Sequence, residues 1–423
     1  MLWSSCGGGS STSSTSTTTT PVANTVPVTV SSGPANNAVN FAYVTVQVCN
    51  PGSTTNCATI PDVQVDTGSS GLRILASAPG VSNLNLTPVT GNGTPVDECY
   101  QWGDGSYLWG PVVQASVVLA GETASSVPIQ VIDSGSAPTN VPSTCAAGGG
   151  SNLGSTAALQ ANGILGVGPV IQDCGTSCSG TSVLPIYWLC PATGCSTASV
   201  PTATQVSNPV TFFSSDDNGV ILTMNSLGSP GSTTGAATAS GTLTFGIGTQ
   251  TDNAIASGVK AYALAGNLIE GQLYYSISTS YNNNTYPTLI DSAQILNYFL
   301  EASVVAANPA GAGVTNCPTN VLLYCPASAV TLPFTAQDTV GDSASLNLSI
   351  GNGDSLWSSS AAKGGTNVAF SNLTGGLALG QANDYVVLGM PFFYGRSVYV
   401  GIAGETPPSG VSLTTHPLGY WAF

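Results

Sequence analysis

The chain consists of short apolar runs separated by Gly, Asn and Pro, a pattern typical of β-strands joined by turns. Six runs are long enough to predict strands: Tyr43–Val48, Val113–Leu119, Val127–Ile132, Gly241–Gly246, Leu273–Ile277 and Tyr385–Leu388. One segment, Gln294–Ala306, has clear helical periodicity, because its apolar residues recur at steps of three and four. The pattern therefore predicts a mainly β protein.

The N-terminal part of the chain has a different composition. Residues 7–38 are mostly Ser, Thr, Gly, Pro and Asn. Such a segment buries too little apolar surface to offset its ordering entropy, so we expect a flexible tether. The length of 423 residues fits one bilobal unit. We divide the remainder into an N-terminal β lobe, residues 39–235, and a C-terminal β lobe, residues 236–423.

Residues 1–6 end in a cysteine, Cys6, that is followed by three glycines. This resembles the last residues of a bacterial lipoprotein signal, in which the cysteine thiol is lipidated. The alternative is a terminal segment with a free thiol. No stretch approaches 18 apolar residues. We therefore expect an exported protein of the cell envelope that is attached to a membrane only through a lipid on Cys6.

Charged residues are scarce, at 5%, and they are mostly acidic. Four Lys and Arg oppose 19 Asp and Glu, which gives a net charge of −15. Nucleic-acid binding is excluded because phosphate contacts need clustered Lys and Arg. A single histidine argues against a His-rich metal site. We expect no metal and no cofactor.

Eleven cysteines indicate disulfides in an oxidising compartment, because the Cys-x-x-Cys spacing of zinc sites does not occur. Four pairs lie close in sequence: Cys49/Cys57, Cys174/Cys178, Cys190/Cys195 and Cys317/Cys325. Cys99 and Cys145 form a fifth pair, and Cys6 is left over. Among the four cysteines between 174 and 195, three pairings remain open.

The most informative feature is an internal repeat. In the first copy, an apolar strand leads into Asp66 of the sequence Asp-Thr-Gly-Ser-Ser, and Gly163–Gly166 follows later. In the second copy, an apolar strand leads into Asp291 of Asp-Ser-Ala, and Val386–Gly389 follows. The distance from the Asp to the Leu before the last Gly is 99 residues in the first copy and 97 in the second. The repeat predicts two similar β lobes, each with one Asp at a strand end.

These residues resemble the pepsin-like aspartic peptidases, in which each lobe offers an Asp-Thr/Ser-Gly loop beside an apolar-apolar-Gly segment. Four further segments match family landmarks in order: the flap hairpin (Tyr100–Ser106), the first apolar-Gly segment (Ala161–Gly168), the strand that opens the second lobe (Ser240–Gly246) and the terminal Leu-Gly strand with its partner (Tyr385–Gly404). The resemblance covers about residues 40–423. It implies a bilobal all-β fold with a cleft between two lobes.

An uncharacterised bacterial family of secreted lipoproteins is a closer resemblance still. It is carried by the Asp-Thr-Gly-Ser-Ser stretch Asp66–Ile74, the Cys-Gly start at Cys6 and the aromatic end Gly419–Phe423.

By the peptidase resemblance, Asp66 and Asp291 form a catalytic dyad that shares one proton, because neighbouring like charges do not both ionise easily. The ionised member takes a proton from a bound water, and the protonated member polarises the peptide carbonyl. Thr67 and Ser292 are expected to hydrogen-bond across the lobes. Gly68 is expected to let the backbone approach Asp66 and donate an amide.

Two residues near the flap depart from the family. Trp102 stands where a Tyr is usual, and Arg73 stands where a Trp is usual. We predict that the two side chains form a cation–π contact, and that Trp102, Gly103, Gly105 and Arg73 belong to the flap and substrate region. The alternatives are that Trp102 is a half-buried sheet aromatic and Arg73 a solvated strand residue.

The second Asp loop departs as well, since Ala293 replaces the family's Gly. If this position needs a positive φ, Ala is strained and displaces Asp291. Asp291 has the alternative role of a helix N-cap, and Asp338 in Asp-Thr-Val-Gly is a rival second Asp.

Two functions therefore remain open. One is an exported, monomeric aspartic endopeptidase that acts on polypeptides. The other is a catalytically weak or inactive pepsin-fold protein that binds peptide or carbohydrate at the cell surface.

Overall fold

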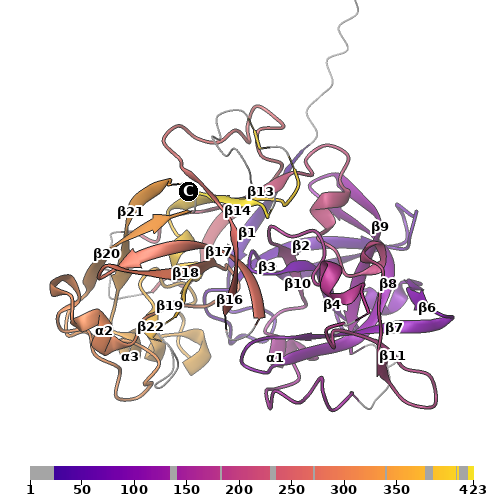
Figure 1. The fold of residues 1–423 in the computed structure, drawn as a ribbon, viewed down its shortest axis with the longest axis horizontal. Helices are drawn as coiled ribbons and strands as arrows, with labels where there is room; N and C mark the ends of the chain where they lie inside the picture. The colour runs from indigo at the N-terminus through magenta and orange to yellow at the C-terminus, as the bar shows by residue number, and fades with distance from the viewer. Residues whose placement is uncertain are drawn as a thin grey trace, which may run out of the picture.

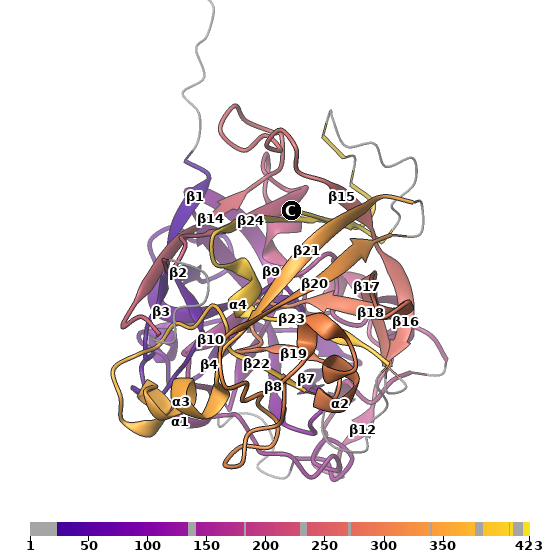
Figure 2. The ribbon, with the colours of Figure 1, turned by 90° about the vertical axis from the view of Figure 1, so that its left-hand side faces the viewer.

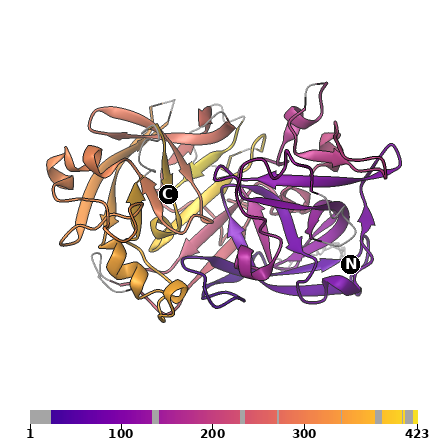
Figure 3. The same cartoon turned by 90° about the horizontal axis from the view of Figure 1, so that it is seen from below.

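The computed structural model describes residues 23–133, 141–181, 183–228, 235–269, 272–338, 341–376, 384–405, 407–408 and 418–423. Two β lobes lie side by side, with the indigo-to-magenta strands in one and the orange strands in the other (Figure 1, Figure 3). The expected bilobal all-β fold is confirmed. The helices that the structure describes are all short: α1 (Thr156–Leu159), α2 (Ala302–Ala306), α3 (Gly353–Ser358) and α4 (Met390–Phe393).

The N-terminal lobe is built on a closed barrel of six strands. Around the barrel the strands are β2 (Ala42–Cys49), β3 (Cys57–Asp66), β10 (Gly163–Val167), β4 (Ser70–Leu75), β9 (Glu122–Ile132) and β8 (Tyr107–Leu119). Each pairs with the next, and β8 pairs back to β2. Buried Val, Ile and Leu side chains fill this barrel, so the β-branched runs of the sequence become its core.

A long hairpin projects from the barrel. It is formed by β7 (Thr94–Gln101) and the first half of β8, and we call it the flap hairpin. Four short strands support it: β5 (Thr87–Pro88), β6 (Thr90–Gly91), β11 (Tyr187–Leu189) and β12 (Ser196–Thr197). Because β11 pairs with β7, the base of the hairpin is fixed on its outer side as well.

A central sheet joins the lobes. Its strands run in the order β1 (Thr25–Val30), β14 (Ala239–Phe245), β13 (Gly219–Met224), β24 (Arg396–Gly401), β25 (Tyr420–Ala422) and β15 (Ala261–Ala263). Strands from both ends of the chain thus lie beside strands from its middle, as Figure 2 shows for β1, β14 and β24.

The C-terminal lobe contains an open sheet. Its order is β21 (Ser343–Ile350), β20 (Val330–Gln337), β17 (Gln272–Tyr281), β18 (Asn284–Ile290), β23 (Val386–Leu388), β19 (Asn297–Phe299) and β22 (Thr374–Gly376), with β16 (Ala265–Ile269) also on β17. The hairpin of β17 and β18 turns at Asn282 and Asn283, which both have positive φ. Asn tolerates that conformation better than other residues with a side chain, so the turn forms there.

Two local expectations are wrong. Residues 25–30 belong to strand β1 instead of a flexible tether, because Val28 and Val30 alternate with polar residues and bury against the central sheet. The segment Gln294–Ala306 is not one helix. Its middle forms β19, which pairs with β22 and β23, and only Ala302–Ala306 is helical. Pairing inside the lobe outweighs a local periodicity of three and four.

The described residues contain five disulfides: Cys49–Cys57, Cys99–Cys145, Cys174–Cys178, Cys190–Cys195 and Cys317–Cys325. The five expected pairs are therefore correct, and the open choice among residues 174–195 falls on the nearest neighbours. Five disulfides indicate an oxidising compartment. Within the described residues, no helix is long and apolar enough to cross a membrane.

Candidate active site

Asp66 lies at the end of β3, where three strands of the barrel meet. The segment β10 pairs in parallel with β3 and antiparallel with β4, so that Gly166 is opposite both Asp66 and Gly71. A Cβ on Gly166 would lie 2.7 Å from the carbonyl carbon of Ser70. Only Gly allows this close approach. The apolar-Gly segment of the sequence is therefore the strand that holds the Asp66 loop in place.

Asp291 occupies the equivalent position in the second lobe. It follows β18, and β23 pairs in parallel with β18, so that Leu388 is opposite Ile290. The Asp291 amide donates to the Leu388 carbonyl at 3.0 Å. The same strand–loop–strand arrangement thus presents both aspartates, as the internal repeat predicts.

Hydrogen bonds across the lobes lock the two Asp loops together. The Thr67 hydroxyl donates to the Ile290 carbonyl at 3.1 Å and accepts the Ser292 amide at 3.0 Å. In return, the Ser292 hydroxyl donates to the Val65 carbonyl at 2.7 Å and accepts the Thr67 amide at 3.1 Å. Thr67 and Ser292 are both fully buried, so these bonds are shielded from water. The arrangement fixes the separation of the two aspartates.

The backbone and hydroxyl donors around Asp66 come from its own loop. Its Oδ1 accepts the amides of Gly68 at 2.8 Å and Ser69 at 3.0 Å, and its Oδ2 accepts the Ser69 hydroxyl. Asp291 Oδ1 accepts the Ala293 amide at 2.8 Å.

Gly68 lies directly against the second aspartate. A Cβ at position 68 would lie 2.5 Å from Cγ of Asp291, well inside van der Waals contact. The absent side chain of Gly68 therefore makes room for the Asp291 carboxyl group. Gly68 is not among the residues with positive φ, so close approach to Asp291, and not backbone freedom, is what requires glycine here.

The two carboxyl groups interact electrostatically. Burial raises the pKa of Asp291 well above its usual value, and the nearby charge of Asp66 raises it further. A hydrogen bond between the two carboxyl groups also raises the pKa of Asp291, whereas donors from Ala293 and the Gln294 side chain oppose the shift. A hydrogen bond between two carboxyl groups requires a proton, since a carboxylate has no donor. The pair can therefore hold one proton at a pH at which an isolated carboxyl is ionised.

Ala293 does not distort its loop, contrary to expectation. It is not among the described residues with positive φ, and its amide reaches Asp291 as the Gly68 amide reaches Asp66. The position therefore does not require glycine for its backbone conformation.

The flap hairpin ends in a tight turn that carries three of the predicted site residues. The Gly105 amide donates to the Trp102 carbonyl at 2.9 Å, and the Trp102 amide donates to the Ser106 carbonyl at 2.9 Å. Gly105 has φ 79°, which favours glycine, and Gly103 is exposed at the tip. Trp102 is half-buried and packs edge-on against the ring of Tyr100 at 5.1 Å.

A pocket of about 230 Å³ lies between the flap turn and the C-terminal lobe. Flap residues, Gly148 and Tyr274 line it. Tyr274 belongs to β17, so this pocket is formed by both lobes.

Arg73 does not form the expected contact with Trp102. The guanidinium lies over the ring of Tyr100, 3.8 Å from the ring centroid, and Arg73 is fully buried. It pairs with Glu98 and Asp173, each at 2.6 Å. The prediction is wrong because a guanidinium buried in a barrel strand needs carboxylate partners, which are Glu98 of β7 and Asp173 of the loop after β10. Arg73 is therefore separated from the flap tip by Tyr100.

Two other residues singled out in the sequence are Asp338 and Cys6. The rival Asp338 uses its carboxylate to accept the amides of Ala263, Gly341 and Asp342, so it holds a surface turn away from Asp66. Cys6, and with it the expected lipidation, lies outside the described residues.

Several residues of the site were not predicted. The Gln294 side chain hydrogen-bonds to Asp291. Burial raises the pKa of Tyr298 of β19, and the nearby charges of Asp104 of the flap and of Asp291 raise it further. The repeat offered a signal for Gln294, because it occupies the place of Ser69 in the first loop. Tyr298 carries no such signal, since only the fold brings β19 towards the flap.

The comparisons agree with this description. The structure is similar to the crystal structure of an aspartic proteinase from Irpex lacteus, with a TM-score of 0.50, 15% sequence identity, and coverage of 94% of this chain and 96% of that chain. The fold is thus that of the pepsin-like aspartic proteinases. The sequence matches the model of the family "Protein of unknown function (DUF3443)" over residues 20–423, and the chain belongs to that family. No curated protein matches the sequence.

Proposed function

We propose that the protein is an exported aspartic endopeptidase that hydrolyses peptide bonds with Asp66, Asp291 and a bound water. The observation that supports this proposal best is the close placement of Asp66 and Asp291, whose loops are held together by the reciprocal Thr67 and Ser292 bonds and by the approach of Gly68 to the Asp291 carboxyl group. Two carboxyl groups that share one proton provide a base and an acid at the same place.

The roles of the two aspartates follow from their surroundings. Asp66 accepts three hydrogen bonds from its own loop, which support a negative charge. We therefore assign Asp66 the role of the base that takes a proton from the attacking water. Asp291 has a raised pKa and holds the shared proton, so it polarises the peptide carbonyl and then protonates the leaving nitrogen. Peptide hydrolysis consumes one water, and it leaves Asp66 protonated and Asp291 ionised. Transfer of that proton from Asp66 to Asp291 restores the starting state.

A polypeptide fits the features of the flap hairpin and of the pocket at its turn. The flap turn and Tyr274 form a pocket from both lobes, and an extended chain offers backbone groups to the flap hairpin. We propose an unfolded or extended polypeptide as substrate and a monomer as the working unit, because this chain supplies both aspartates.

The decisive experiment is incubation with an unfolded protein at pH 2 to 7, with and without a statine-type inhibitor. Wild type should cleave at acid pH, and Asp66→Asn and Asp291→Asn should each abolish cleavage. Asp338→Asn is the matched control and should remain active, since Asp338 accepts the amides of Ala263, Gly341 and Asp342 and belongs to neither Asp loop. Activity that survives either dyad substitution would exclude this dyad. Absence of cleavage by wild type throughout would favour the peptide- or carbohydrate-binding alternative.

Export and membrane attachment are a separate part of the proposal. Five disulfides support an oxidising compartment. We propose that Cys6 carries a lipid and that residues 7–22 link it to the folded part. Mass spectrometry of the N-terminal peptide should detect the acyl groups, and Cys6→Ser should release the protein from membranes. An unmodified Cys6 thiol in protein recovered from the cell envelope would contradict it.

A further inference from the structure

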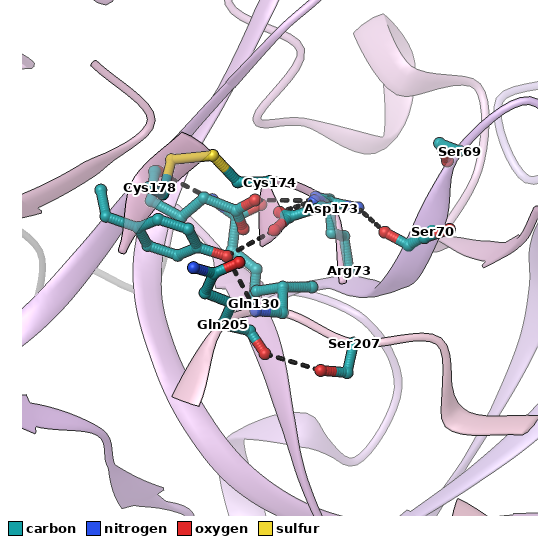
Figure 4. Close-up of polar contacts among 12 residues, drawn as sticks. Ser69, Ser70, Arg73, Gln130, Asp173, Cys174, Cys178, Gln205 and Ser207 are labelled. Carbon is teal, nitrogen blue, oxygen red and sulfur yellow. Dashed lines mark hydrogen bonds and ion pairs between the residues drawn. A yellow bond between two sulfur atoms is a disulfide. The ribbon is translucent and has the colours of Figure 1, made fainter. Parts of the chain in front are cut away.

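A second pair of acidic side chains, distinct from the dyad, lies at the base of the flap hairpin. Arg73 Nη2 donates to Oε1 of Glu98 and to Oδ2 of Asp173, both at 2.6 Å. Figure 4 shows Arg73 next to Asp173, beside the Cys174–Cys178 disulfide. Arg73 and Glu98 are fully buried, and the Asp173 side chain is 1% exposed. One positive charge thus faces two carboxyl groups in the protein interior.

The charge balance of this cluster points to a proton. If both carboxyl groups were ionised, a net negative charge would be buried, which is costly without another cation. The other polar groups that face the pair are Tyr187 of β11, Tyr100 of β7 and the side-chain amide of Gln130 of β9. The Tyr187 hydroxyl donates to Asp173 Oδ1, and Gln130 donates to the Glu98 carbonyl. None of these groups adds a positive charge.

The hydrogen bonds locate the proton between Glu98 and Asp173. Both oxygens of Asp173 already accept donors, from Tyr187 and Arg73. In contrast, Glu98 Oε2 is buried and has no partner with a hydrogen to donate among the described residues. The two carboxyl groups nevertheless lie close together, because both accept from the same nitrogen, Arg73 Nη2, at 2.6 Å. A proton on the pair satisfies that oxygen and removes the excess charge.

We propose that Glu98 and Asp173 share one proton beside the guanidinium of Arg73, and that this cluster positions the flap hairpin. When the proton is lost at higher pH, the contact between the cluster and the hairpin loosens. The effect on the flap matters for catalysis only if the proposed peptidase function holds, whereas the shared proton does not depend on that function.

The contacts carry the effect from the cluster to the flap tip. Glu98 and Tyr100 are on the same strand, β7, and their side chains lie on the same side of it. The guanidinium lies over Tyr100 at 3.8 Å, and Tyr100 contacts Trp102 of the flap turn. The partner Asp173 is on the loop after β10, the strand that holds Asp66. Repulsion between two ionised carboxyl groups therefore pushes the hairpin away from the element that supports the dyad.

The sign of the pH effect follows from burial. Burial and the charge of Glu98 raise the pKa of Asp173 above its value in the unfolded chain. The folded state then binds one more proton than the unfolded state between those two pKa values, so stability is present at acid pH and is lost as pH rises. One proton corresponds to about a tenfold change in the folding equilibrium constant for each pH unit.

The test compares wild type with Glu98→Gln, in which an amide replaces the shared proton as donor to Asp173. The folding equilibrium constant is measured by denaturant unfolding between pH 4.5 and 8. The folding equilibrium constant of wild type should fall with rising pH by about tenfold more per pH unit than that of Glu98→Gln, up to the pH at which the shared proton is released. Hydrogen exchange of residues 94–119, corrected for the intrinsic chemical rate, should show protection that falls with pH in wild type and stays constant in the variant.

Asp97→Asn is the matched control, since Asp97 is on the same strand and its side chain points to the other face. Burial raises the pKa of Asp97 to about 6, so this variant should alter the slope of stability against pH only below about pH 6.5 and leave the exchange of the hairpin unchanged. If Glu98→Gln does not fold, Asp173→Asn is compared in its place.

Equal slopes for wild type and variant would overturn the shared proton. A difference in slope with identical exchange of the hairpin would overturn the link to the flap. Neither measurement requires peptide cleavage, so failure of this inference is distinguishable from failure of the proposed function.

Discussion

The amide of Ala293 donates a 2.8 Å hydrogen bond to Oδ1 of Asp291, and the φ of Ala293 is not positive. The first loop contains the same bond from Gly68 to Asp66, also at 2.8 Å. A Cβ at position 293 is therefore compatible with correct placement of the second aspartate. The strongest sequence argument for an inactive site, the replacement of Gly by Ala, loses its physical basis.

Ala293→Gly should therefore not raise peptidase activity. The amide is already in place, so glycine adds only conformational freedom to the unfolded chain and lowers stability by about 0.4–1 kcal/mol. We expect kcat/KM on one peptide to be unchanged or slightly lower, with a small decrease in the free energy of unfolding. A clear rise in kcat/KM would show that Ala293 does strain the Asp291 loop.

Gly68→Ala should have a much larger effect than Ala293→Gly. The new Cβ would lie 2.5 Å from Asp291 Cγ, so either the carboxyl group or the loop must move. A displacement of about 1 Å at a catalytic group can cost on the order of 100-fold in rate. We also expect a destabilisation of about 1–3 kcal/mol from overpacking.

The matched control for Gly68→Ala is Gly180→Ala. Gly180 also lacks a positive φ, and a Cβ there would lie 3.9 Å from its nearest neighbour. Denaturant unfolding and peptide cleavage of both variants provide the comparison. Similar losses in the two variants would mean that contact with Asp291 is not the cause.

The fold was predictable because a repeat leaves its order and spacing in the sequence. The two Asp loops and their apolar-Gly partners could be read from residue types alone, since an Asp at a strand end and a Gly at a close approach are each restricted chemically. The disulfides were predictable for a similar reason, as eight of the ten paired cysteines lie close in sequence.

The environment of Arg73 was not predictable from local sequence. Its partners Glu98 and Asp173 are 25 and 100 residues away and meet it only in the folded lobe, Glu98 from β7 and Asp173 from the loop after β10. The β19 strand shows the opposite difficulty. Its local pattern is helical, and pairing with β22 and β23 decides its conformation. In both cases tertiary contacts outweigh what a short window of sequence contains.

Thr67 is expected to be critical for joining the lobes. Thr67→Val keeps the shape of the side chain but removes the donor to the Ile290 carbonyl and the acceptor for the Ser292 amide. Two buried backbone groups then lose their partners, at about 1–3 kcal/mol each. We expect a decrease of about 2–5 kcal/mol in the free energy of unfolding, measured by denaturant titration.

Thr67→Ser is the control because it keeps the hydroxyl. It should retain most of the stability and activity of wild type. If Thr67→Val and Thr67→Ser were equally stable, the cross-lobe hydroxyl would contribute little.

The pH dependence of stability should also reveal Asp291. Its pKa is raised by burial and by Asp66, so folding favours the protonated form. Stability from this group is present below the unfolded pKa of about 4 and is lost as pH rises through the folded pKa.

Asp291→Asn cannot lose a proton, and its side-chain oxygen can still accept the Ala293 amide. Relative to wild type, we expect this variant to gain stability from pH 4 towards neutrality, by at most about 1.4 kcal/mol for each pH unit. Thermal or denaturant unfolding of both proteins at pH 4 and 7 measures this gain. A variant that is less stable than wild type by the same amount at both pH values would show that Asp291 is not held protonated by folding. This would leave its role as the acid of the dyad without support.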